Sequence, residues 1–122
     1  GLNKKNIAIN GTKVAVLGLS YKPNIGDDRE SPSYKIIQHL KDIGAEVASF
    51  DPFVLEKSTA KSLEDAISGA KAVIVATGHK LFRDLTPAQL HEAGVEVVVD
   101  GRNCLPREKF IKAGIVYRGI GR

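Results

Sequence analysis

Lys13-Val14-Ala15-Val16-Leu17-Gly18 is a short apolar run that ends in glycine. Its length and its β-branched content predict a buried strand. Further apolar runs follow at 46–50, 72–76, 95–99 and 115–117. Strands that are apolar on both faces need cover on both sides, so the runs predict a parallel sheet between helices.

Helix signals separate these predicted strands. Ser31 and Pro32 are expected to start a helix, because serine caps helix N-termini and proline is favoured at the first helical position. Gly44 is expected to end it. Its apolar face is marked by Ile36, Ile37, Leu40 and Ile43. Shorter helices are predicted at 62–67, from Thr86 to Gly94, and over 106–113.

The alternation of strand and helix predicts the fold class. We expect an α/β, three-layer, Rossmann-like doubly wound parallel sheet of about five strands, in the order 2-1-3-4-5. In such sheets, ligands bind outside the carboxyl ends of the strands, where the strand order reverses. That place corresponds to Gly18 and the long polar loop after it, residues 19–31.

The bulk composition excludes several classes of protein. The chain has 122 residues, 43% hydrophobic and 26% charged, with a net charge of +4, as expected for one soluble domain. No apolar run approaches the roughly 18 residues of a membrane span. No basic stripe with interleaved aromatic residues points to nucleic acid. The one cysteine, Cys104, cannot form an internal disulfide, so a cytoplasmic location is expected.

The start of the chain also leads to expectations. Residues 1–11 are polar and aperiodic, so they are predicted to be a linker or the end of a preceding element, with the domain itself over 12–122. The chain begins at Gly1 and contains no methionine. We therefore expect a cut or processed piece of a longer protein.

The loop after the first predicted strand departs from the dinucleotide-binding pattern. A Rossmann turn reads G-x-G-x-x-G between the first strand and helix. Here Gly18-Leu19-Ser20-Tyr21-Lys22-Pro23 stands instead, and no acidic residue ends the second strand at the usual distance. This domain is therefore not expected to bind NAD in the ordinary Rossmann way.

Four stretches together resemble the C-terminal, UDP-binding domain of the UDP-glucose/GDP-mannose dehydrogenase family. They are Gly18-Leu19-Ser20-Tyr21-Lys22-Pro23-Asn24, Asp27-Asp28-Arg29-Glu30-Ser31-Pro32, Asp51-Pro52 and Asp100-Gly101-Arg102-Asn103. The resemblance covers nearly the whole chain from Thr12 onward. The order and spacing of the stretches are far more specific than any one of them.

The resemblance implies an activity and a division of labour. Family members oxidise the C6 alcohol of a nucleotide sugar to the uronate with two NAD per turnover, in polysaccharide biosynthesis. An N-terminal domain binds NAD, a central helical domain dimerises the enzyme, and the C-terminal domain binds the nucleotide. The family's catalytic cysteine, which captures the aldehyde and forms a thioester, precedes this segment. The chain is thus expected to bind the UDP of UDP-glucose or a UDP-N-acetylhexosamine and to be inactive alone.

The same resemblance assigns four site residues. Tyr21 and Lys22 match the family's substrate-binding aromatic and lysine, and an ammonium suits a diphosphate or a sugar hydroxyl. Arg102, after the fourth predicted strand, matches an arginine that contacts substrate. Arg29 matches an arginine that reaches the NAD on the other domain, and a planar fork suits a pyrophosphate.

From the residues alone, plainer interpretations remain open. Lys22 can be a solvated loop lysine and Arg102 a turn arginine without a ligand. Arg29 can form an ion pair within the loop, with Asp27, Asp28 or Glu30. Acidic neighbours can also hold its guanidinium while no cofactor is present.

Other polar residues are weaker candidates. Cys104 lacks the context of the family's catalytic cysteine, and a lone cysteine is usually a small packed residue. His39, His79 and His91 have no metal-ligand spacing and are interpreted as surface or internally bonded histidines. Asp51 is expected to shape the end of the second strand rather than to touch ligand.

Two other functions compete with this hypothesis. A stand-alone nucleotide- or coenzyme-A-binding module without catalysis would share the fold. The spacing of Lys22 and Arg29, together with Arg102, argues against it. A receiver-like signalling domain would need acidic residues where the chain has Gly18-Leu19 and Thr77-Gly78, so it is set aside.

Overall fold

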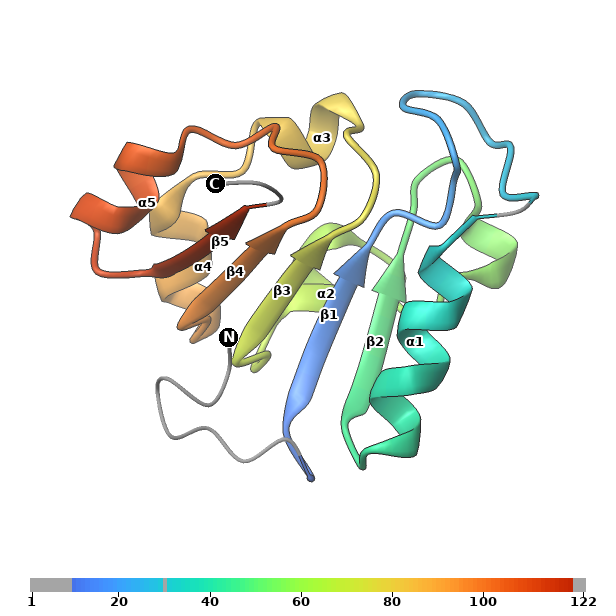
Figure 1. Ribbon diagram of the computed structural model, residues 1–122, viewed down its shortest axis with the longest axis horizontal. Coiled ribbons are helices and arrows are strands. Elements are labelled where there is room, and N and C mark those ends of the chain that lie inside the picture. The colour runs from blue at the N-terminus through green and yellow to red at the C-terminus, as the bar shows by residue number, and fades with distance from the viewer. Residues whose placement is uncertain (1–9, 30, 120–122) are drawn as a thin grey trace.

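The sheet confirms the predicted class and strand order. The computed structural model describes residues 10–29 and 31–119. Five parallel strands lie in the order β2-β1-β3-β4-β5 (Figure 1). Their bounds are β1 Lys13–Leu17, β2 Glu46–Phe50, β3 Ala72–Val75, β4 Val97–Asp100 and β5 Val116–Gly119.

The helices agree with the prediction in position and differ at several ends. They are α1 Ser33–Asp42, the 3-10 helix η2 Leu55–Lys57, α2 Leu63–Ile67, α3 Lys80–Arg83, α4 Pro87–Ala93 and α5 Arg107–Lys112. The sequence did not predict η2 and α3. Each is about one turn long, too short to show a helical period.

The start and the end of α1 correct the predicted helix. Pro32 occupies the N-cap position and Ser33 is the first helical residue. Ser31 still helps at this end, because its Oγ accepts a hydrogen bond from the Ser33 N–H at 3.2 Å. Ile43 lies beyond the last helical residue and is 46% exposed, so its placement on the apolar face was wrong.

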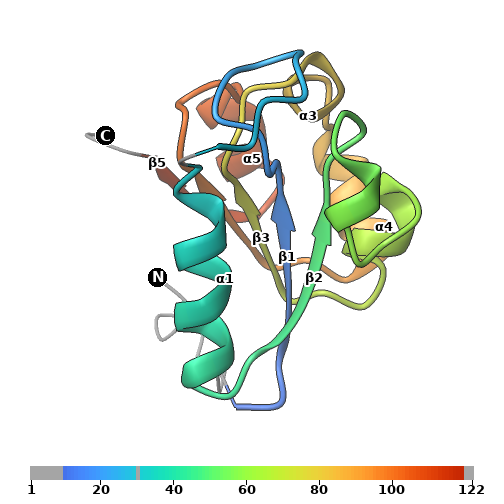
Figure 2. The ribbon, with the colours of Figure 1, turned by 90° about the vertical axis from the view of Figure 1, so that its right-hand side faces the viewer.

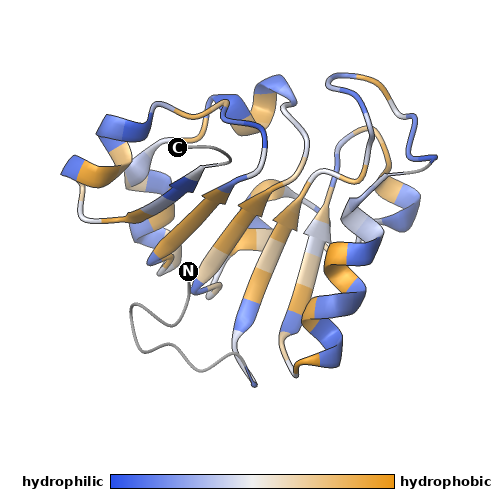
Figure 3. Cartoon of the chain, in the orientation of Figure 1, coloured by the Kyte–Doolittle hydropathy of each residue, from blue (hydrophilic) through white to orange (hydrophobic). Residues whose placement is uncertain are grey.

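Helices cover the two faces of the sheet unequally. In the described part of the chain, α1 lies on one face, and α2 and α4 lie on the other (Figure 2). Phe82 of α3, Leu90 of α4 and Phe110 of α5 are fully buried in the same cluster as α2. Leu40 of α1 joins a smaller cluster. The strands in the middle of the sheet are the most hydrophobic elements (Figure 3).

The carboxyl end of β1 turns sharply at Gly18. The sequence predicted this glycine as the last strand residue, whereas β1 ends at Leu17. Gly18 has a φ of 108°, and a Cβ at this position would overlap Thr77. Glycine tolerates such a backbone conformation and such a close approach. The chain therefore leaves the sheet at once and enters the long loop.

At the start of the described chain, Asn10 and Gly11 precede β1. The predicted linker 1–11 lies outside the described residues except for Asn10 and Gly11, which form a turn. The Gly11 N–H donates to the Gly44 carbonyl at 2.8 Å. Within residues 10–29 and 31–119, each helix is too short or too polar to cross a bilayer.

Candidate functional site

The loops after β1, β3 and β4 meet at the carboxyl edge of the sheet. The strand order reverses between β1 and β3, where α/β sheets bind their ligands. The loop after β1, residues 19–29, carries Tyr21, Lys22 and Arg29; we call it the β1 loop. Residues 76–79 follow β3 and residues 101–106 follow β4. The predicted site residues thus lie on two neighbouring segments of one edge.

Asp51 fixes the start of the β1 loop. This fully buried carboxylate follows β2. Its Oδ2 accepts hydrogen bonds from Leu19 N–H at 2.7 Å, Ser20 N–H at 2.9 Å and Ser20 Oγ at 2.8 Å. Burial alone would raise the pKa of Asp51, but these bonds and those from His79 and Phe53 hold it below its usual range. Asp51 therefore joins the end of β2 to the start of the β1 loop.

Backbone and side-chain contacts close the β1 loop. The Tyr21 N–H donates to the Asp27 carbonyl at 2.7 Å across the neck of the loop. At its tip, Asn24 has a φ of 61°, and its N–H donates to Nδ1 of His79 at 2.6 Å. The Asn24 Oδ1 accepts from the Lys80 N–H at 3.0 Å. Lys22 therefore lies on a loop that is held at both its neck and its tip.

Arg102 is fixed by carbonyl groups of the neighbouring loops. Its Nε donates to the Ala76 carbonyl at 3.1 Å, and its Nη2 donates to the Tyr21 carbonyl at 2.9 Å. The carboxylate of Asp100, fully buried at the end of β4, accepts from the Arg102 N–H at 3.2 Å. The arginine thereby links the loops after β1, β3 and β4.

Lys22 and Arg102 line one cavity. It measures about 370 Å³ and is lined by Tyr21, Lys22, Pro23, Gly78, Arg102 and Cys104. Both cations and the exposed ring of Tyr21 therefore adjoin one space at the sheet edge. Two such cations can bind a phosphate group. The aromatic ring beside them can pack against an apolar or planar group.

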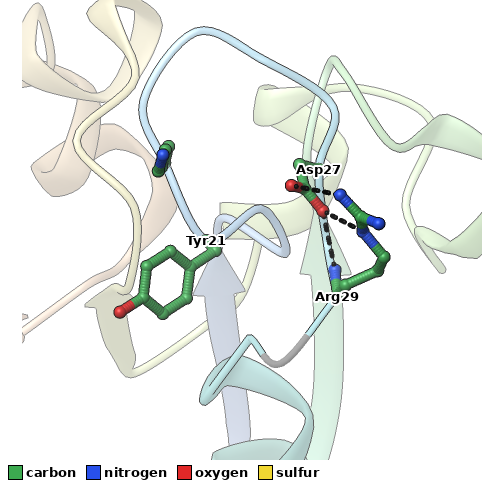
Figure 4. Close-up of a pocket in the computed structure, with 4 residues that line it drawn as sticks. Tyr21, Asp27 and Arg29 are labelled. Atoms are coloured by element: carbon green, nitrogen blue, oxygen red, sulfur yellow. Dashed lines mark hydrogen bonds and ion pairs between the residues drawn. The ribbon is translucent and has the colours of Figure 1, made fainter.

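Arg29 lines a second cavity, which shares Tyr21 and Lys22 with the first. This cavity measures about 390 Å³ and is lined by Tyr21, Lys22, Asp27 and Arg29. Figure 4 shows the Arg29 guanidinium paired with Asp27, away from the Tyr21 ring. Nε and Nη2 bond the two carboxylate oxygens at 3.0 and 3.1 Å. Among the described carboxylates of the loop, Asp27 is therefore the partner of Arg29.

Cys104 and the three histidines were the weaker candidates for the site. The half-buried Cys104 lies with its Sγ 3.6 Å from Oδ1 of Asp100, and burial together with this carboxylate raises its pKa to about 11. His79 is buried and bonded, whereas His39 and His91 are exposed. In the described ranges, no three His, Cys, Asp or Glu side chains lie close enough to hold a metal ion.

Comparison with known sequences identifies relatives of the chain. Residues 15–107 match the UDP-glucose/GDP-mannose dehydrogenase family, UDP binding domain. A UDP-N-acetyl-D-mannosamine dehydrogenase from Pyrococcus horikoshii is 35% identical over 99% of this chain. A UDP-glucose 6-dehydrogenase from Rhizobium meliloti is 35% identical over 93% of it. The chain spans 28% of the length of each of these two relatives.

Solved structures agree with the sequence comparison. An NDP-N-acetyl-D-galactosaminuronic acid dehydrogenase from Methanosarcina mazei Go1 superposes with a TM-score of 0.93 at 31% identity. That match covers 99% of this chain and 27% of the other. The same fold is therefore built into dehydrogenases several times longer.

Proposed function

Because the chain belongs to the UDP-glucose/GDP-mannose dehydrogenase family, as its UDP binding domain, we propose that it binds the UDP part of a nucleotide sugar for a dehydrogenase. The enzyme would oxidise the C6 alcohol of UDP-glucose or a UDP-N-acetylhexosamine to the uronate, for polysaccharide biosynthesis. Of the two relatives named above, one is a UDP-N-acetyl-D-mannosamine dehydrogenase and the other a UDP-glucose 6-dehydrogenase.

The observation that carries this proposal is the shared cavity of Lys22 and Arg102. Lys22 would pair with a diphosphate oxygen, because it is exposed and lies on a loop that is held at its neck and its tip. Arg102 would add a second cation from a rigid position, and Tyr21 would cover the nucleoside or the sugar. Binding the remote nucleotide contributes positioning energy at the reacting carbon.

NAD would be the cofactor and would accept the hydride when bound. The residues present fit a minor role toward it, because the glycine turn of a dinucleotide site is absent while Arg29 is exposed. Exposed ion pairs such as Arg29 with Asp27 contribute little to stability. Arg29 can therefore exchange Asp27 for a pyrophosphate held mainly by another domain.

The same proposal covers location and assembly. We place the protein in the cytoplasm, because the one cysteine of the 122-residue chain, Cys104, is a free thiol. The N-terminal NAD-binding and central dimerisation domains of the family would be its partners, within a homo-oligomer.

Titration calorimetry with UDP, coenzyme A and NAD tests the proposal. We expect UDP to bind and Lys22→Ala to weaken it about tenfold, as for the loss of one charge-assisted hydrogen bond. Lys41→Ala is the matched control, because Lys41 is also exposed and lies at the far end of α1. Binding of coenzyme A without UDP would instead support the stand-alone module.

A further inference from the structure

His79 lies beneath the β1 loop and contacts it through one ring nitrogen. The side chain follows β3 and is fully buried. Its Nε2 lies 2.9 Å from Oδ2 of Asp51, and its Nδ1 lies 2.6 Å from the backbone nitrogen of Asn24. The two nitrogens thus face a strand end on one side and the tip of the loop on the other.

These two partners define the protonation state of the ring. A backbone N–H can only donate, so Nδ1 carries no proton and accepts. The carboxylate of Asp51 can only accept, so Nε2 carries the proton and donates. The ring is therefore neutral with both nitrogens satisfied, and Asp51 orients it toward Asn24.

The bond to Asn24 acts on the residues that line the substrate cavity. Tyr21 is held at the neck of the loop by Asp27 and Arg102, and Asn24 is held at the tip by His79 and Lys80. Lys22 and Pro23 lie between these two anchors. The position of Lys22 therefore depends on His79, although the imidazole does not line the cavity.

We infer that His79 is a positioning residue for substrate binding, whose Nδ1 holds the β1 loop in the conformation that presents Lys22 to the nucleotide diphosphate. This inference rests on the proposed function for the identity of the ligand. The loop geometry itself does not depend on that identity.

A purely structural role is the competing explanation. The ring also packs against Phe53, with centroids 4.8 Å apart, and against Phe82, at 5.5 Å. In that case His79 would only fill the core and satisfy Asp51. The two explanations separate because one nitrogen serves the loop and the other serves Asp51.

Two substitutions separate the nitrogens. In His79→Asn, the amide oxygen takes the place of Nδ1 and can accept from Asn24, while the bond to Asp51 is lost. In His79→Gln, the amide nitrogen takes the place of Nε2 and can donate to Asp51, while the loop loses its acceptor. His39→Asn, at an exposed position of α1, is the control for the loss of an imidazole.

Binding and hydrogen exchange are measured on folded protein at one pH. We expect the Kd for UDP to rise about tenfold in His79→Gln and to stay within about threefold of the unmodified chain in His79→Asn. The Asn24 amide should exchange at least about tenfold faster in His79→Gln than in the unmodified chain, and His79→Asn should show no such increase. His79→Asn should lower the melting temperature more than His79→Gln.

Equal Kd values in the two variants, or affinities that fall in the order of the melting temperatures, would overturn the inference. If the unmodified chain does not bind UDP, the proposed function fails. The exchange rate of the Asn24 amide then still decides whether Nδ1 holds the loop. If one variant does not fold, exchange in the other is compared with the unmodified chain and with His39→Asn.

Discussion

Two buried carboxylates organise the loops around the cavity. Asp51 follows β2 and binds the start of the β1 loop, and Asp100 ends β4 and binds the loop that carries Arg102. The Asp100 carboxylate also accepts from the Leu105 N–H and the Tyr117 hydroxyl, each at 2.8 Å. Such charges are tolerated inside a protein only when donors surround them. The carboxylates therefore fix the backbone on which the candidate ligand residues stand.

Asp51→Asn tests the strength of this arrangement. Both carboxylate oxygens of Asp51 accept hydrogen bonds from backbone N–H groups. In the asparagine variant one oxygen is replaced by an NH₂ group, which will face a backbone N–H without an acceptor between them. We expect the free energy of unfolding at pH 7 to fall by about 2–4 kcal/mol, measured by urea denaturation. Asp42→Asn, at the exposed end of α1, is the control and should change the unfolding free energy by less than about 0.5 kcal/mol.

The pH dependence of unfolding gives an independent test of the same residue. The pKa of Asp51 is lower in the folded chain than in the unfolded one, so its contribution is present above about pH 4 and lost as the pH falls below it. The unfolding free energy of Asp51→Asn should therefore decline less between about pH 4 and pH 2 than that of the unmodified chain. Parallel curves for the two proteins would show that Asp51 is not the group responsible.

Cys104 should be slow to react despite lining the cavity. Its pKa of about 11 leaves a thiolate fraction at pH 7.5 that is roughly 300-fold below that of an ordinary thiol, whose pKa is about 8.5. Alkylation by iodoacetamide should accordingly be about a hundredfold slower than for glutathione, and denaturation should restore the ordinary rate. Rapid labelling of folded protein would reopen the question of a nucleophile.

The sequence predicted part of the site because parallel strands end at one edge. Lys22 and Arg102 follow strands that are neighbours of β3, so their proximity was predictable from the strand order. The contact of His79 with Asn24 was not, because 55 positions separate them and the contact needs the left-handed backbone at Asn24. Arg29 had several possible carboxylate partners, and only geometry distinguishes Asp27.

Among the elements, α4 shows how local signals define a short helix. Thr86 accepts from the Gln89 N–H, and the Gln89 side chain accepts from the Thr86 N–H, which together form a capping box. Pro87 occupies the first helical position, and Gly94 follows the helix with a φ of 90°. The predicted bounds were close because these end signals are local.

Thr86→Ala should lower the unfolding free energy by about 1 kcal/mol, because the side-chain acceptor at the helix start is lost. Thr86→Ser retains the hydroxyl, so its unfolding free energy should stay within a few tenths of a kcal/mol of the original value. Chemical denaturation of the three proteins measures both effects. An equal loss in the serine and alanine variants would point to the lost methyl group instead of the cap.

The predicted strand and helix bounds differ where tertiary contacts decide them. The fourth strand was predicted at 95–99 and lies at Val97–Asp100. The Val95 N–H instead bonds the Leu90 carbonyl and completes the end of α4. Similarly, α3 forms beside the tip of the β1 loop, where the Lys80 N–H binds Asn24. Neither feature leaves a periodic pattern in the sequence.

In the molecule as a whole, the candidate ligand residues lie at one edge of the five-stranded sheet. The chain spans 28% of the length of the relatives from Pyrococcus horikoshii and Rhizobium meliloti. What it offers is one arginine held by hydrogen bonds, Arg102, and two further cations on the β1 loop, Lys22 and Arg29. Chemistry on a sugar needs a hydride acceptor and a reactive group besides these.

The 122-residue chain alone should therefore bind UDP and produce no NADH from UDP-glucose or UDP-N-acetyl-D-mannosamine. Its one thiol, Cys104, has a raised pKa, and its β1 loop lacks the glycine turn of a dinucleotide site. Absorbance at the NADH band measures turnover, with the Pyrococcus horikoshii enzyme as the positive control. Enzymes commonly turn over about 10 times per second, so even a thousandfold weaker activity is detectable within an hour. NADH formation at that level, abolished by Lys22→Ala, would show that these residues carry catalysis as well as binding.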